Sequence, residues 1–222
     1  MNSEKKALIF DSSSIITLAM NGLLPILPKL KESFHGKFFI TPNVRQETVD
    51  NPLNIRRFEL EALNILDLIE KGVLEVINPK GLDSETEKIK ALVNSSFTAH
   101  GEKMKIMHSG ECSCLALASL LKDYKSLLVI DERTARMLLE NPENLRKLFE
   151  SKLHTEVTMT LKNNFKNMSI VRSSELALVA FKKGLIKLPS SKQGVTEALL
   201  YASKYNGCSI SQDEIQEARK LF

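Results

Sequence analysis

The sequence predicts an α/β protein, a three-layer α/β/α sandwich with a parallel central sheet. Short apolar runs alternate along the chain with segments of helical periodicity, and this alternation implies parallel pairing through right-handed crossovers. Two of the runs, residues 7–10 and 127–130, are almost wholly apolar, as expected of strands that are buried on both faces. Each run is followed directly by an aspartate, Asp11 or Asp131.

The first half of the chain alternates between predicted strands and helices. The strand at residues 7–11 is followed by three serines, of which Ser12 or Ser13 can cap the next helix. Pro42 favours the start of another helix, because a proline at the first helical position loses no hydrogen bond, and Glu47 lies in that helix. The other predicted elements are a strand at 37–40, a helix at 56–71 and a strand at 73–76.

The second half continues the alternation. A helix at 83–95 leads into a polar linker, and Ser109 can cap a helix at 109–122. The strand at 127–130 is followed by helices at 134–140 and 143–163, a strand at 168–171, a helix at 173–184 and two short helices after residue 188. We expect residues 1–140 to form the core, and 141–222 to supply a helical insertion, the last strand and the closing helices of the same domain.

Composition favours a single soluble domain in the cytoplasm. With 222 residues, of which 43% are apolar, the chain is long enough to bury a large core. The cysteines Cys112, Cys114 and Cys208 have no metal-finger spacing and fit a reducing compartment. No leader peptide is recognised, and no run approaches the ~18 apolar residues of a membrane span, so no membrane contact is expected. The formal net charge of +4 is compatible with a polyanionic partner but does not require one.

Acidic residues stand where a parallel sheet would gather them at one edge. Asp11 and the pair Asp131-Glu132 follow strands of the same polarity, and Glu47 and Glu111 lie near the starts of predicted helices. Carboxylates so close together would take up protons unless a cation compensated their charge. Oxygen ligands without His or Cys favour Mg²⁺ or Mn²⁺. A site of this kind activates water and neutralises a phosphodiester oxygen, so the expected chemistry is phosphoester hydrolysis.

Four stretches of the chain resemble, in order, spacing and secondary-structure context, the successive motifs of a PIN domain. They are residues 8–16 around Asp11, the turn 41–44 that leads to Glu47, Ser109-Gly110-Glu111 at a helix start, and residues 128–133 around Asp131. Residues 168–222 resemble the last strand and closing helices of longer prokaryotic members, with 143–163 as an insertion. Many such relatives are toxins of toxin–antitoxin pairs and form homodimers.

The resemblance implies a metal-dependent endoribonuclease, a hydrolase that uses Mg²⁺ or Mn²⁺ and leaves a 5′-phosphate. Its catalytic metal ligands in this chain would be Asp11, Glu47 and Glu111. Ser13 matches a hydroxyl that supports the metal shell or a phosphate. The fourth acid of the family stands one or two residues past the strand, so either Asp131, which we favour, or Glu132 could serve.

RNA, in single-stranded form, is the substrate that the resemblance favours, because an unpaired backbone can enter an acidic cleft that a metal has neutralised. Basic side chains beside the acids could hold its phosphates without reading its sequence, although a solvated surface explains each of them equally well. These candidates are Arg45, Arg133 and Arg136, accompanied by Lys103, Lys105 and His108. A small antitoxin protein and a second copy of the chain are the other expected partners.

Each acid also has an ordinary structural explanation. Asp11 and Asp131 could cap helices, Glu111 is favoured in a first helical turn by the helix dipole, and Glu47 alone is typical of a solvated helix. The chain has no GxxxxGK[ST] for an NTPase and no GxGxxG for a dinucleotide. The main functional alternative is a catalytically degenerate PIN fold that binds RNA or a protein without cutting.

Overall fold

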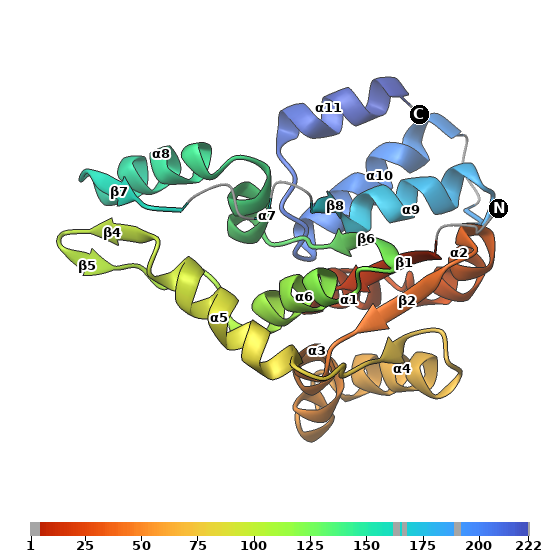
Figure 1. Ribbon diagram of the computed structural model, residues 1–222. Coiled ribbons are helices and arrows are strands. Elements are labelled where there is room, and N and C mark those ends of the chain that lie inside the picture. Colours follow the sequence, from red (N-terminus) through yellow and green to blue (C-terminus); the bar gives the residue numbers. More distant parts are fainter. Residues whose placement is uncertain (1–4, 162–164, 166–167, 189–191, 222) are drawn as a thin grey trace.

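The computed structural model describes residues 5–161, 165, 168–188 and 192–221. Its centre is a sheet of five strands in the order β3-β2-β1-β6-β8, all parallel (Figure 1). The strands are β1 (Lys5–Phe10), β2 (Lys37–Ile40), β3 (Glu75–Val76), β6 (Tyr124–Val129) and β8 (Ser169–Val171). The predicted parallel sheet is therefore confirmed.

Helices cover both faces of this sheet. On one face α1 (Ser12–Met20) contacts α4 (Glu59–Glu70) and α9 (Ser173–Lys182). On the other face α6 (Ser109–Leu120) packs on β1 and β6, and α5 (Leu82–Asn94) packs on α6. The predicted three-layer α/β/α sandwich is thus also confirmed. The connecting helices are η1 (Leu24–Ile26), α2 (Leu27–Phe34), α3 (Pro42–Arg45), the π-helical turn η2 (Gln46–Asp50), η3 (Pro52–Asn54) and α7 (Arg133–Glu140).

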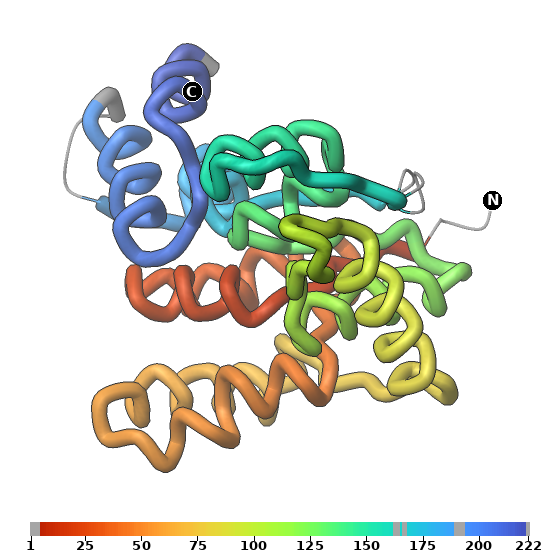
Figure 2. Tube along the Cα trace, turned by 90° about the vertical axis from the view of Figure 1, so that its left-hand side faces the viewer, coloured from red at the N-terminus to blue at the C-terminus, as the bar shows by residue number. Residues whose placement is uncertain are grey.

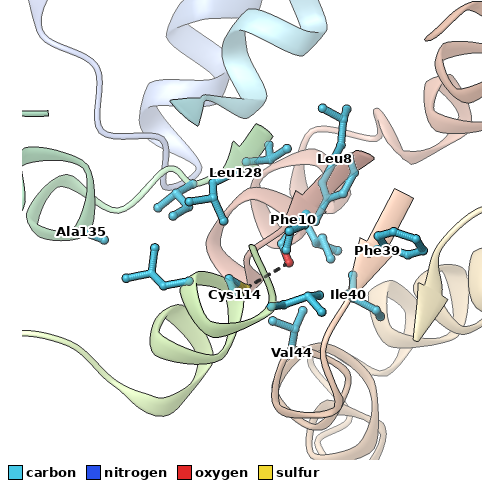
Figure 3. Packing of buried hydrophobic residues seen from close by; sticks show 14 of the residues in the cluster. Leu8, Phe10, Phe39, Ile40, Val44, Cys114, Leu128 and Ala135 are labelled. Atoms are coloured by element: carbon cyan, nitrogen blue, oxygen red, sulfur yellow. Dashed lines mark hydrogen bonds between the residues drawn. The ribbon is translucent and has the colours of Figure 1, made fainter. Parts of the chain in front are cut away.

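β1 and β6 pair directly, and the candidate site lies where these two strands end. Phe10 pairs with Val129, and the backbone N–H of Asp11 then donates to the carbonyl of Val129 at 3.0 Å. The residues of β1 from Ala7 to Phe10 are buried, and Cys114 of α6 lies against them, with its Sγ 3.6 Å from the carbonyl oxygen of Phe10 (Figure 3). The apolar strand thus places Asp11 directly at the edge of the core.

A second sheet, antiparallel and of order β5-β4-β7, lies apart from the first (Figure 1). Its strands are β4 (Phe97–Ala99), β5 (Glu102–Lys103) and β7 (Val157–Met159), and α8 (Pro142–Leu153) packs against it. The rings of Phe97 and Phe149 meet edge to face with centroids 5.8 Å apart. The stretch that we predicted as a polar linker therefore contains two strands, of which β4 pairs with β7, about 60 residues further along the chain.

The helix predicted at 143–163 is wrong in its second half. α8 ends at Leu153 because His154 adopts a left-handed conformation, with φ of 50°. A residue in this conformation ends a helix as a C-terminal glycine does. The chain then enters β7, and residues 162–163 of the predicted helix lie outside the described residues.

The C-terminal helices complete the helical layer that contains α1. α10 (Lys192–Tyr205) packs on α9, and α11 (Gln212–Leu221) packs on α10 (Figure 2). The predicted break between these two helices occurs at Gly207, whose φ of 118° only glycine adopts readily. Within the described part of the chain no single helix is long and apolar enough to cross a membrane, and α1 with the η1–α2 segment passes that test only as a pair bent by 106°.

Candidate active site

Asp11 both begins α1 and faces the other acids. Its side chain is the N-cap of α1, since Oδ2 accepts hydrogen bonds from the backbone N–H of Ser13 at 3.1 Å and from the Ser13 hydroxyl at 2.6 Å. The prediction that Ser12 or Ser13 caps this helix is therefore wrong. Both hydrogen bonds use the same oxygen, and Oδ1 accepts none from the residues that the structure describes.

Glu47 reaches the site from the π-helical turn η2. π-turns are rare and occur often at functional sites, because the extra residue re-aims a side chain. The Ser12 hydroxyl donates to Oε2 of Glu47, which joins this turn to the first residue of α1. The acid predicted from the Pro42 helix thus lies beside the acid that follows β1.

Gly110 makes room for the Glu47 carboxylate. A Cβ at position 110 would lie 2.6 Å from Oε2 and 2.8 Å from Oε1 of Glu47, closer than real contacts allow. The carboxylate therefore sits against the backbone of the first turn of α6, where the helix dipole favours a negative charge. Sequence reasoning included Gly110 only as part of a motif and missed this role.

Glu111 lies in the same first turn of α6. Its Oε2 accepts the backbone N–H of His108 at 3.0 Å, so the carboxylate caps the helix from within. The helix begins at Ser109 as predicted, but the residue at its N-cap is His108, and the predicted capping role of Ser109 is wrong. The hydroxyl of Ser109 instead accepts a hydrogen bond from Lys90 at 2.9 Å.

Electrostatics show that Asp11, Glu47 and Glu111 share one environment. Burial, and then the nearby charges of Glu111 and Glu47, raise the pKa of Asp11 from its ordinary 3.8 to about 7, against the opposing effect of the Ser13 hydrogen bonds. Burial also raises the pKa of Glu111, with Glu47 adding to the effect. Burial and the charges of all three acids raise the pKa of Cys114 beneath them.

These three acids fit a divalent cation by the chemistry of their donors. They offer oxygen atoms alone, one carboxylate oxygen of Asp11 has no hydrogen bond from the described residues, and the absent side chain of Gly110 leaves space where Glu47 lies. Among the described residues, no three His, Cys, Asp or Glu side chains already converge as closely as a metal ion requires. The three acids therefore lie near one another but not at the distances of metal ligands, and binding would require their side chains to move together.

The carboxylate of Asp131 is hydrogen-bonded to Ser173 and not to the other acids. Its carboxylate accepts the backbone N–H of Ser173 at 2.8 Å and the Ser173 hydroxyl at 2.5 Å, so it caps α9 rather than the helix that follows it. The side chain is completely buried, and its charge acts on Cys208. Only its backbone N–H reaches the acidic cluster, through a 3.1 Å hydrogen bond to the Ser13 hydroxyl.

Glu132 caps α7, since its Oε2 accepts the backbone N–H of Ala135 at 2.6 Å. The roles predicted for Asp131 and Glu132 as metal ligands stay predictions, and either carboxylate would have to leave its present partner to reach Asp11. Sequence reasoning missed Ser173 as the partner of Asp131, and no local signal links residues that are so far apart in the chain.

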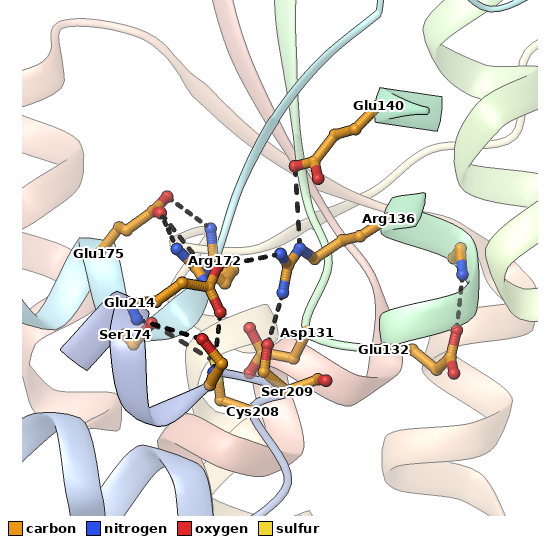
Figure 4. Close-up of polar contacts among 12 residues, drawn as sticks. Asp131, Glu132, Arg136, Glu140, Arg172, Ser174, Glu175, Cys208, Ser209 and Glu214 are labelled. Atoms are coloured by element: carbon orange, nitrogen blue, oxygen red, sulfur yellow. Dashed lines mark hydrogen bonds and ion pairs between the residues drawn. The ribbon is translucent and has the colours of Figure 1, made fainter. Parts of the chain in front are cut away.

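The three candidate arginines differ in what they contact. Arg45 forms an exposed ion pair with Asp50, with Nε 3.4 Å from Oδ1. Arg136 is buried and donates to the carbonyl of Ser209 at 2.5 Å (Figure 4). Arg133 is exposed and has no ion pair within the described part of the chain. Their roles in RNA binding stay predictions.

Comparison with known proteins gives one finding. A family model described as a PIN domain, DUF3368, matches residues 7–143, a range that includes Asp11, Glu47, Glu111 and Asp131. No curated protein and no solved structure showed significant similarity. PIN domains are generally nucleases and typically bind divalent metals, which supports a hydrolase that acts on nucleic acid. Because the match covers more than half of the 222 residues, this chain belongs to the PIN-domain family.

Proposed function

We propose that this protein is an endoribonuclease that uses Mg²⁺ or Mn²⁺, bound by Asp11, Glu47 and Glu111, to hydrolyse RNA. The observation that carries the proposal is the position of the three acids. Glu47 accepts a hydrogen bond from Ser12, the residue next to Asp11, and its carboxylate lies against Gly110, the residue next to Glu111. The role of Asp11 as a helix cap explains its position, but it does not explain why two further acids lie close enough to raise its pKa.

Ser13 and Gly110 have different roles in positioning the acids of this site. The Ser13 donors occupy Oδ2 of Asp11 and leave Oδ1 for the cation, while Gly110 allows Glu47 to approach the N-terminus of α6. A divalent cation would supply the charge that lowers the pKa of an attacking water and neutralises the phosphodiester. Asp11 would have to lose its proton first, so binding is expected to weaken below about pH 7.

The preference for unpaired RNA rests on family resemblance and on where exposed cations lie. Arg133 stands at the start of α7, Lys103 is the last residue of β5, and Lys105 lies between β5 and α6. All three side chains are exposed and have no ion pair within the described residues. Exposed cations of this kind can contact phosphates, which would hold a flexible strand without reading its bases.

A cleavage assay tests this function. Mixed-sequence single-stranded RNA, labelled at its 3′ end, is incubated with the protein and Mg²⁺, Mn²⁺ or EDTA, beside DNA of the same sequence. We expect metal-dependent RNA fragments whose new 5′ ends carry phosphate. The variant Asp11→Asn should be inactive, and Asp123→Asn, which changes an exposed acid outside the site, should cleave normally. Cleavage by Asp11→Asn at the wild-type rate would contradict the proposal, and binding without cleavage by the wild type would favour the degenerate alternative.

We also propose a small inhibitory protein as a partner, as in a cytoplasmic toxin–antitoxin pair. The observation that favours it is an apolar groove of about 310 Å³ between α1, η3 and α4, which Glu47 borders. Its apolar lining is exposed at Ile16, Met20, Ile55 and Phe58. Light scattering compares the purified protein alone with its mixture with the product of an adjacent short reading frame. A complex of the two would support this second proposal, and its absence would contradict it, whether the protein alone is a monomer or a homodimer.

A further inference from the structure

A continuous chain of hydrogen bonds joins α9 to the candidate metal ligand Asp11. The hydroxyl and backbone N–H of Ser173 donate to the Asp131 carboxylate at 2.5 Å and 2.8 Å. The backbone N–H of Asp131 donates to the Ser13 hydroxyl oxygen at 3.1 Å, and that hydroxyl donates to Oδ2 of Asp11 at 2.6 Å. Ser173 and Asp11 are 162 positions apart in the sequence, so folding alone brings them into one network.

The direction of donation in this chain is fixed when Asp11 is ionised. An N–H can only donate, so the bond from Asp131 occupies a lone pair of the Ser13 oxygen. The hydroxyl hydrogen of Ser13 is then directed to Asp11, whose ionised carboxylate can only accept. The network therefore keeps Oδ2 of Asp11 in use and holds Oδ1 as the oxygen that is left for a cation.

Asp131 can orient Ser13 only if it is itself immobile. Ser173 holds its carboxylate, and the backbone N–H of Ser209 donates to its carbonyl at 3.0 Å. Arg136 in turn holds the carbonyl of Ser209 (Figure 4). Ser173 and Ser209 lie outside the matched residues 7–143, so these contacts come from the C-terminal part of the chain.

We propose that Ser173 is a positioning residue for the metal site and acts on Asp11 through Asp131 and Ser13. It touches neither the acids Glu47 and Glu111 nor the groups that would bind RNA. The proposal rests on the proposed function, because its main readout is the affinity of Asp11 and its neighbours for a divalent cation. Partners beyond the ligands commonly change metal affinity 10- to 100-fold, so a residue one step further out is expected to have a smaller effect.

A double-mutant cycle in the full chain tests the proposal. Mn²⁺ affinity is measured by calorimetry for wild type, Ser13→Ala, Ser173→Ala and the double variant, at a temperature where all are folded. We expect Ser173→Ala to weaken Mn²⁺ binding about three- to tenfold, and to add no further loss in the Ser13→Ala background, because the path is already broken there. Ser173→Thr, which keeps the hydroxyl, should restore wild-type affinity.

Ser174→Ala is the matched control. Ser174 is the neighbouring buried serine of α9, and its hydroxyl contacts Cys208 instead of the network. Unchanged affinity in Ser173→Ala, an equal loss in Ser174→Ala, or losses that multiply in the double variant would each overturn the proposal.

Failure of the proposed function would be visible separately. If the wild type binds no Mn²⁺, the metal site is wrong, and the same four proteins are compared by urea unfolding in EDTA. Ser13 and Ser173 share no direct hydrogen bond, so non-additive free energies of unfolding would still support the connection through Asp131, and additive ones would overturn it.

Discussion

Asp11 and Asp131 follow neighbouring parallel strands, and both are buried, with 2% and 0% of their surfaces exposed. They differ in the donors that surround them. Asp131 receives an N–H and a hydroxyl from Ser173, one on each carboxylate oxygen. Both donors to Asp11 come from Ser13 and meet one oxygen, and two further acids lie nearby.

The same sequence pattern, an aspartate after a buried strand, therefore gives two chemical outcomes. A carboxylate with a donor on each oxygen stabilises the fold by joining distant segments. When a carboxylate has one free oxygen and acidic neighbours, its charged form is destabilised. A bound cation would stabilise that charged form. The comparison predicts that substitutions at these two positions will have opposite effects on stability.

The pH dependence of stability should show the largest effect. The raised pKa of Asp11, about 7 in the folded protein against an ordinary 3.8, is equivalent to about 4 kcal/mol against the charged form. Between these values the folded state holds a proton that the unfolded state has lost. The contribution of Asp11 therefore lowers stability as pH rises from about 4 to 7, and is constant above that.

Urea unfolding in EDTA at several pH values checks this. Asp11→Asn should be more stable than wild type at pH 8 and should lose most of the advantage at pH 4, where both side chains are neutral. A variant that is less stable than wild type at pH 8 would show that Asp11 is satisfied in the folded protein, as Asp131 is, and the contrast would fail.

Gly110→Ala should damage the site and leave the fold intact. The new Cβ would displace the Glu47 carboxylate, which is the end of a flexible side chain, so the helix can remain. We expect Mn²⁺ affinity and RNA cleavage to fall about 10- to 100-fold, while alanine in a helix adds up to about 1 kcal/mol of stability.

Gly194→Ala is its matched control, because Gly194 is also helical and a Cβ there would meet no atom within 4 Å. Affinity and cleavage should be unchanged in this variant. Equal losses in the two variants, or none in Gly110→Ala, would show that Glu47 does not depend on this contact.

Asp131→Asn should destabilise the protein, in contrast to Asp11→Asn. The amide that replaces one oxygen no longer accepts the Ser173 hydroxyl in its present geometry, and a buried mismatch of this kind costs about 1–3 kcal/mol. Thermal unfolding at pH 8 measures the loss, with Asp123→Asn as a control that should change little. Stability equal to wild type would mean that Asp131 is not a structural acid.

Glu214→Gln should have the smallest effect. Glu214 accepts from Arg172 at 2.7 Å and lies 3.6 Å from Arg136, but it is partly exposed, so solvent screens the pairs. We expect a loss of about 0.5–1 kcal/mol that shrinks at high salt. A loss above about 2 kcal/mol would mean that this cluster holds the Asp131 region more firmly than Ser173 does.

Local sequence patterns predicted the central sheet, because its strands are short apolar runs and their polarity follows from the alternation with helices. They did not predict the second sheet, since β4 pairs with residues about 60 positions away and neither segment is strongly apolar. The end of α8 was missed for a different reason. The residue in the left-handed conformation is His154, where a glycine would have been recognised.

For the candidate site, the sequence predicted which acids lie at the sheet edge but not where each carboxylate points. Asp11, Glu47 and Glu111 lie near one another, because strand ends and helix starts fix their positions, and their role as metal ligands stays a prediction. The orientation of Asp131 depends on Ser173, which comes 42 residues later and belongs to another helix. Side-chain direction was therefore decided by tertiary contacts that no local pattern contains.

A Mn²⁺ titration of wild type, Asp11→Asn and Asp131→Asn, followed by calorimetry at pH 8, tests the central claim most directly. We predict one class of site in the wild type, an affinity at least about 100-fold weaker in Asp11→Asn, and a loss in Asp131→Asn no larger than the roughly tenfold effect expected of groups outside the metal shell. Equal losses in the two variants would contradict the account, because they would make Asp131 a ligand of the same rank as Asp11.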